Sequence, residues 1–75
     1  MVRIDLLKQA IDKSGVTMVA LAANSGIERG TLYNRLNGTG EFTASEIYGL
    51  VHALRLSNSE REEIFFAPQV DSNAT

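Results

Sequence analysis

Apolar residues recur along much of the chain at the three- and four-residue spacing of amphipathic helices. The clearest example follows Thr43, and its apolar stripe consists of Ile47, Leu50, Val51 and Leu54. Thr43 and Glu46 have the spacing of a capping box, in which each side chain accepts a hydrogen bond from the backbone N–H of the other residue. The pattern therefore predicts a well-defined helix that begins after Thr43.

Three helices are predicted before this one. Asp5 and Thr17 are suitable N-caps because their side-chain oxygens accept hydrogen bonds from the free N–H groups of a first turn. Gly15 and Gly26 are expected to end helices because glycine readily adopts the left-handed conformation of a C-cap. The predicted helices span residues 6–14, 18–25 and 29–36.

Ser57 and Glu60 repeat the capping-box spacing and open a short acidic helix that ends near Phe66 and Pro68. We therefore predict one compact all-α domain of five helices over residues 1–67 and a flexible tail over residues 68–75.

The strongest break in the helical pattern is the Asn-Gly-Thr-Gly run at residues 37–40, which predicts a loop. Phe42 is expected to pack into the core as an apolar plug, at the point where this loop comes back to the domain. The periodicity predicts a core of Leu7, Ile11, Leu21, Ile27, Leu32, Leu36, Ile47, Leu50, Val51 and Leu54.

The composition of the chain argues against several classes of function. A chain of 75 residues without cysteine has no disulfide or thiolate metal site. The single histidine, His52, falls on the polar side of its predicted helix with no ligand-like spacing around it, and no nucleophile–base pair is evident. We expect no enzyme, no metal, no cofactor and no small-molecule ligand. With no signal-peptide pattern and no apolar run near the roughly 18 residues of a membrane span, we expect a cytoplasmic protein.

The net charge of −2 is unusual for a nucleic-acid-binding domain, but the charge is unevenly distributed. Residues 1–38 hold five basic and three acidic side chains, a net charge of +2, whereas residues 39–75 hold two basic and six acidic ones, a net charge of −4. Any anionic partner is therefore expected to meet the N-terminal half, with the acidic run at residues 60–63 pointing away.

Two short helices joined by a turn containing Gly26 and Ile27, with the small Ala22 at their crossing, match a helix-turn-helix unit. The stretch from Thr17 to Gly38 resembles the lambda-repressor-like helix-turn-helix family of phage and bacteria, and looks closest to small Cro or repressor-like regulators. The likeness is carried by Thr17, Leu21-Ala22, Gly26-Ile27, Thr31-Leu32 and Asn37-Gly38, and it extends through residues 41–47 to Ile64-Phe65-Phe66.

The resemblance implies a transcriptional regulator, bacterial or phage-encoded and nucleoid-associated, that reads double-stranded DNA with the helix at residues 29–36. It puts Arg29, Gly30, Thr31 and Asn34 against the bases. Arginine pairs with guanine and asparagine with adenine through two hydrogen bonds, and a threonine methyl touches that of thymine. Contacts to the DNA backbone are expected from Thr17, Met18, Tyr33, Arg35, Asn37 and Thr39. Asn37 and Thr39 could equally serve only as turn formers.

Ile64, Phe65 and Phe66 are consecutive apolar residues, and one helix face cannot bury all three. Either two pack in the core and one stays partly exposed, or this segment contributes to a homodimer contact on a palindromic operator. In both interpretations, the core of a single chain leaves one hydrophobic side chain uncovered.

An alternative of a different class is a protein-interaction module, such as an antitoxin-like partner, on the same helical scaffold. The net charge of −2 and Met18 favour it, and Glu28 is a second departure from the family. Met18 stands where the family commonly has a phosphate-binding glutamine, and Glu28 stands where a serine or threonine often caps the reading helix.

Overall fold

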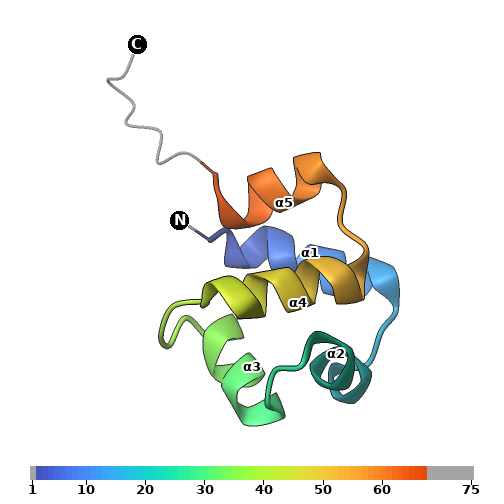
Figure 1. Ribbon diagram of the computed structural model, residues 1–75, viewed down its shortest axis with the longest axis vertical. Coiled ribbons are helices and arrows are strands. Elements are labelled where there is room, and N and C mark those ends of the chain that lie inside the picture. Colours follow the sequence, from blue (N-terminus) through green and yellow to red (C-terminus); the bar gives the residue numbers. More distant parts are fainter. Residues whose placement is uncertain (1, 68–75) are drawn as a thin grey trace.

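The computed structural model describes residues 2–67, and all regular structure in this part of the chain is helical. The helices are α1 (Ile4–Ser14), α2 (Met18–Ser25), α3 (Arg29–Leu36), α4 (Ala44–Leu54) and α5 (Asn58–Phe65). In Figure 1, α4 crosses the middle of the molecule, with α1 and α5 on one side and α2 and α3 on the other. The expected five-helix, all-α domain is confirmed for these residues, and the tail predicted at residues 68–75 lies outside them.

The start of α1 differs from the prediction. The helix begins at Ile4, its N-cap is Arg3, and the guanidinium of Arg3 binds the Asp5 carboxylate at 2.8 and 3.1 Å. The backbone N–H of Arg3 also donates to the carbonyl of Ile64 at 2.6 Å, which anchors this end of α1 to α5. The prediction that Asp5 caps α1 is therefore wrong, because Asp5 lies inside the first turn, where the helix dipole also favours a carboxylate.

The other predicted N-caps are confirmed. The hydroxyl of Thr17 accepts a hydrogen bond from a backbone N–H in the first turn of α2 at 3.1 Å. Thr43 and Glu46 form the complete capping box at the start of α4, with hydrogen bonds of 3.0 and 3.2 Å. Ser57 and Glu60 form the same box at the start of α5, at 2.8 and 3.1 Å.

Residues 26–28 connect α2 to α3 in a tight turn. Gly26 adopts the left-handed conformation with φ of 74°, and the N–H groups of Gly26 and Ile27 both donate to the carbonyl of Ala22, at 3.0 and 3.2 Å. Ala22 and Ile27 are both buried, so the turn is packed against the core as well as hydrogen-bonded. This arrangement fixes the direction in which α3 leaves α2.

The core draws on every helix. Its buried residues are Leu7, Ile11, Leu21, Ala22, Ile27, Leu32, Leu36, Leu50, Ile64 and Phe65. Phe42 is half-buried and meets Phe65 edge to face at 5.8 Å, as expected of a plug. The predicted burial of Ile47, Val51 and Leu54 is only partly correct. They pack against the core but stay half-exposed because α4 has a flank that no other helix covers completely.

Gly49 is the residue that lets α4 approach α2. A Cβ atom at this position would overlap the backbone carbonyl oxygen of Ser25, the last residue of α2. Glycine in the interior of a helix normally costs about 0.5–1 kcal/mol relative to alanine. Here that cost is offset because the two backbones can meet directly.

Gly49→Ala is expected to lower the free energy of unfolding by about 1–3 kcal/mol, the usual cost of overpacking, although alanine is the better helix former. Urea unfolding followed by circular dichroism measures the change. Gly30→Ala is the matched control, because Gly30 is an exposed helical glycine whose added Cβ would have only Glu28 Oε1 nearby, at 3.8 Å. Its stability should stay the same or rise by up to about 1 kcal/mol. Equal midpoints for the two variants would contradict the close-approach explanation.

Candidate nucleic-acid interface

Helix α3 has one buried face and one open face. Leu32 and Leu36 are 0% and 7% exposed and anchor the buried face in the core. The four residues predicted to read bases are on or beside the open face: Arg29, Gly30 and Asn34 are exposed, and Thr31 is half-buried. Gly30 and Asn34 are four residues apart and therefore lie one above the other along the same face.

The N-terminus of α3 combines free backbone donors with a negative charge. Glu28 is the N-cap but makes no side-chain capping hydrogen bond. Its Oε1 atom lies 3.8 Å from the position that a Cβ on Gly30 would occupy, so the carboxylate stays beside the first turn. The dipole of α3 stabilises this carboxylate, but the same carboxylate repels any phosphate that approaches.

Thr17 and Met18, the predicted contacts to the DNA backbone at the start of α2, differ in their hydrogen-bond donors. Thr17 is exposed, and because its Oγ1 accepts the capping hydrogen bond, its O–H is still available as a donor. Met18 is half-buried and packs against the core, and a thioether has no hydrogen to donate. Of the two residues, only Thr17 has a side-chain donor for a phosphate.

The backbone N–H groups of residues 37–39, which open the loop after α3, are already occupied. The N–H of Asn37 donates to Tyr33 and Asn34 carbonyls, and the N–H of Thr39 donates to the Asn34 carbonyl at 2.9 Å. The side chains of Asn37 and Thr39 are exposed, as is Tyr33, which is 47% exposed. Asn37 and Thr39 are thus turn formers, and any contact they make with DNA must use their side chains.

Arg35 ties the end of α3 to the start of α4. Its Nε donates to Glu46 Oε1 at 3.1 Å, its Nη2 donates to Glu46 Oε2 at 3.4 Å, and its Nη1 donates to the carbonyl of Thr39 at 3.4 Å. A Cβ on Gly40 would press on the same guanidinium. The Arg35 side chain is only 21% exposed. Arg35 is therefore a structural link, and its predicted phosphate contact must use whatever hydrogens this link leaves free.

Glu46 is shared between this ion pair and the capping box. Burial on its own would raise the pKa of Glu46, but the N–H of Thr43 and the guanidinium of Arg35 outweigh it and hold the pKa below its ordinary value. The carboxylate therefore stays ionised and keeps α3, the loop and α4 connected.

The acidic side chains of α5 lie away from the open face of α3. In Figure 1, α3 and α5 are on opposite sides of α4. Glu60, Glu62 and Glu63 are exposed on α5, so their charge is separated from Arg29 by the body of the domain. The basic Lys8 and Lys13 of α1 lie on the same side of α4 as α5 (Figure 1), so the side that carries α2 and α3 has Arg29 and Arg35 against Glu28.

The predicted dimer contact at residues 64–66 needs a correction. Ile64 and Phe65 are 4% and 3% exposed and belong to the core of the single chain, whereas Phe66 is 51% exposed. Both side chains are part of the core, and Phe65 also meets the Phe42 ring, so they have no surface to offer a partner. Only Phe66 of this group remains available, and sequence reasoning missed the exposed Tyr48 on α4.

Comparison of the chain with protein-family models, with curated proteins and with solved structures found no match. Within the described part of the chain, no helix is long and apolar enough to cross a membrane, and no cluster of three or more His, Cys, Asp or Glu side chains has the arrangement of a metal site.

Acid should destabilise the fold through three carboxylates. Arg3 lowers the pKa of Asp5, the contacts of Thr43 and Arg35 lower that of Glu46 despite its burial, and hydrogen bonds from Ser57 lower that of Glu60. Because each group binds its proton less readily when folded, the stability it contributes is present above its ordinary pKa, 4.5 for the two glutamates and 3.8 for Asp5, and is lost as the pH falls through the lower folded values.

The melting temperature should therefore stay constant above about pH 5 and fall from there to about pH 3, and Glu46→Gln should start lower and fall less steeply. Glu41→Gln, which changes an exposed glutamate in the preceding loop, is the control and should keep the wild-type slope. A Glu46→Gln profile parallel to the wild type would contradict the role of this carboxylate.

Proposed function

We propose that this chain is a sequence-specific DNA-binding transcriptional regulator of the Cro or repressor type. Helices α2 and α3 act as a helix-turn-helix, and α3 enters the major groove of an operator. The observation that carries the proposal is the open face of α3, where Arg29, Gly30 and Asn34 are exposed side by side while the opposite face is buried. The resemblance of residues 17–38 to lambda-repressor-like proteins supports the same function.

The open face has the chemistry for reading bases. Arg29 can donate two hydrogen bonds to guanine, and Asn34 can both donate to and accept from adenine. The methyl group of Thr31 suits the methyl group of thymine, and Gly30 has no side chain to hold α3 away from the groove. Each good two-bond contact discriminates against a wrong base by about 1–3 kcal/mol.

Phosphate contacts would position α3 without reading sequence. The O–H of Thr17, the phenol of Tyr33 and the side chains of Asn37 and Thr39 are exposed donors for this purpose. A homodimer on a palindromic operator would place two α3 helices in successive major grooves, with half-site centres about 34 Å apart. Such a regulator would act in the cytoplasm, at the nucleoid.

Arg29→Ala is expected to weaken binding to the preferred operator by about 1–3 kcal/mol and to relax the preference at one base position. Selection from randomised duplex DNA gives the operator, and fluorescence anisotropy then measures the affinity. Lys13→Ala is the control, because it removes the same positive charge as Arg29→Ala at a site away from α3. Lys13 lies at the end of α1, beside Glu60 of α5. An equal loss of affinity for operator and random DNA in Arg29→Ala would contradict base reading by this residue.

Glu28→Ser should strengthen DNA binding. Serine removes the carboxylate beside the first turn of α3 and supplies the missing N-cap, which is worth about 1 kcal/mol of stability. Affinity for operator and for random duplex should rise together, because the change relieves repulsion from phosphate. Glu41→Ser removes the same charge outside α3 and is the control. Unchanged affinity in Glu28→Ser would show that DNA does not approach this end of α3.

The alternative function is a protein-interaction module, and exposed apolar side chains on the same two helices favour it. Val19 on α2 is 59% exposed and Tyr33 on α3 is 47% exposed. Binding to duplex DNA that falls steeply with rising salt would support the regulator. No retardation of any duplex at low salt, with no motif enriched in the selection, would support the interaction module.

A further inference from the structure

Among residues 2–67, the ion pair of Arg35 and Glu46 is the one that joins two helices. The other two, Arg3–Asp5 and Arg61–Glu62, connect residues one or two positions apart in the sequence. The Arg35–Glu46 pair is also the least exposed, with side chains only 21% and 16% open to solvent. Its two hydrogen bonds, of 3.1 and 3.4 Å, engage both carboxylate oxygens, and a two-bond contact of this kind fixes orientation as well as distance.

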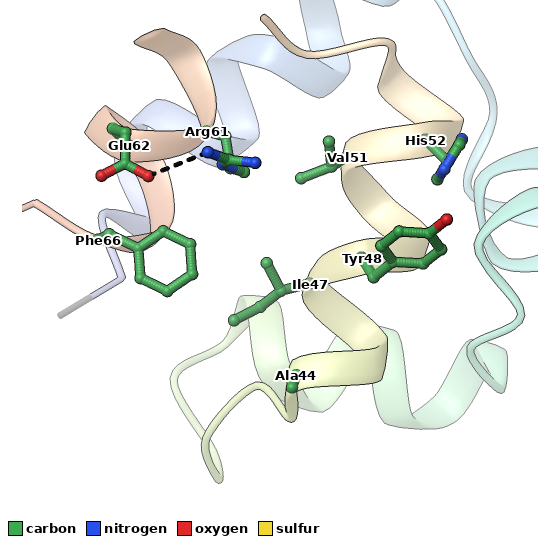
Figure 2. Close-up of a pocket in the computed structure, with 8 residues that line it drawn as sticks. All are labelled: Ala44, Ile47, Tyr48, Val51, His52, Arg61, Glu62 and Phe66. Atoms are coloured by element: carbon green, nitrogen blue, oxygen red, sulfur yellow. Dashed lines mark hydrogen bonds and ion pairs between the residues drawn. The ribbon is translucent and has the colours of Figure 1, made fainter. Parts of the chain in front are cut away.

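The start of α4, which carries Glu46, is attached on several sides. The carboxylate of Glu46 accepts the N–H of Thr43 at 3.0 Å, and Gly49 brings the next turn of α4 against the backbone of α2. On its other flank α4 lines a groove with α5, where Ile47 projects toward Phe66 (Figure 2). Glu46 therefore offers α3 a fixed support.

Arg35 connects this support to the base-reading side chains of α3. Thr31 precedes Arg35 by four residues, so the two lie one above the other on the same flank of α3, and both are half-buried. The buried leucines of α3 keep its apolar face inward, and the ion pair adds a directional contact that opposes rotation of α3 about its own axis. Recognition side chains must be held within roughly 0.5 Å and 10–20° of the productive geometry.

The same guanidinium also binds the loop that follows α3. Its Nη1 donates to the carbonyl of Thr39 at 3.4 Å. Asn37 and Thr39 are two of the residues proposed above to contact phosphate. Phosphate contacts set the register of a protein on the duplex, while base contacts read the sequence. Arg35 thus holds the proposed phosphate contacts at a set distance from the base-reading residues.

We propose that Arg35 and Glu46 are positioning residues for base reading. Their ion pair holds Thr31 and Asn34 at the angle and register at which these side chains discriminate between base pairs, and neither residue of the pair touches a base. This inference rests on the proposed function. It gives Arg35 a role other than the phosphate contact expected from the sequence.

The two roles of Arg35 predict opposite effects of changing Glu46. If Arg35 bound phosphate, the Glu46 carboxylate would compete with DNA for the guanidinium, and its removal would strengthen binding to every duplex. If the ion pair positions α3, the same change lowers the affinity for the operator although it removes a negative charge. Glu46→Gln separates the two, because glutamine can still complete the capping box of α4.

The ratio of operator affinity to random-duplex affinity, measured by fluorescence anisotropy, tests the proposal. The operator is the sequence that the wild type selects from randomised duplex DNA. Glu46→Gln should lower the ratio about threefold to thirtyfold, the range seen when residues outside a binding site are changed, while random-duplex affinity stays the same or rises. An unfolded fraction weakens binding to both duplexes by the same factor, so a loss of stability alone leaves the ratio unchanged.

Two variants that remove the same charge are the controls. Glu41→Gln changes an exposed glutamate in the loop before α4, and Glu62→Gln breaks an exposed ion pair on α5. Both should keep the wild-type ratio. Circular dichroism at the assay temperature checks that every variant keeps its helices.

Arg35→Lys tests the other half of the pair. Lysine keeps the positive charge but cannot make the two-bond contact with a carboxylate. The ratio should fall as in Glu46→Gln, while random-duplex affinity and its salt dependence stay close to those of the wild type. Because both changes break one link, the double variant should lose little more than the larger single loss.

The outcomes separate this proposal from the proposed function. A wild type that prefers an operator, with Glu46→Gln and Arg35→Lys that discriminate equally well, would overturn the positioning role and leave the regulator intact. Tighter binding of Glu46→Gln to operator and random duplex alike would overturn it in favour of a phosphate contact by Arg35. A wild type that shows no preference for any duplex would remove the regulator, and the positioning role with it.

Discussion

The close crossing of α2 and α4 at Gly49 positions the other helices. Because Gly49 has no side chain, the backbone of α4 reaches the carbonyl of Ser25 at the end of α2. α3 packs on α2, and α1 packs on α4 and α5. The placement of the helices on both sides of α4 therefore depends on the distance between α2 and α4 at this crossing. A small domain buries a limited apolar area, which makes such close contacts more important than in a large protein.

Helix α3 is held at both ends. At its start, Gly26 and Ile27 join it to α2 through hydrogen bonds and burial, and at its end Arg35 joins it to Glu46 of α4. An isolated helix of eight residues is unstable in water, so α3 owes its order to these attachments and to its buried leucines. The open face can then carry exposed polar residues, and under the proposed function α3 is already ordered before it meets DNA.

The domain separates its surfaces by charge and by chemistry. The open face of α3 offers polar side chains, with Arg29 at its start, while the α4–α5 flank offers apolar rings with a neutral pair of charges. The acidic side chains of α5 are on the opposite side of α4 from α3 (Figure 1). Under the proposed function, this separation keeps the acidic side chains of α5 away from anionic DNA, although the chain as a whole has a net charge of −2.

Local chemistry alone determined most of the helices. The caps at Thr17, Thr43 and Ser57, the break at Gly26 and the apolar periodicity depend on neighbours within a few residues, so they can be read from the chain. The prediction of Asp5 as the N-cap of α1 was wrong because the helix begins earlier, after Arg3. The backbone of Arg3 is positioned by its hydrogen bond to Ile64, far away in sequence. For the candidate site, spacing indicated which residues of α3 would be exposed, but a sequence does not show which side chains are already engaged.

Only the tertiary structure decided how distant residues meet. It showed that Arg35 binds Glu46, that Gly49 touches Ser25, and that Phe66 is exposed while Phe65 is buried. It also revealed that Tyr48 is exposed beside a groove between α4 and α5. The physical reason is the same in each case: hydrogen bonds, close approach and burial between helices depend on distances that the folded chain sets and that local propensity does not contain.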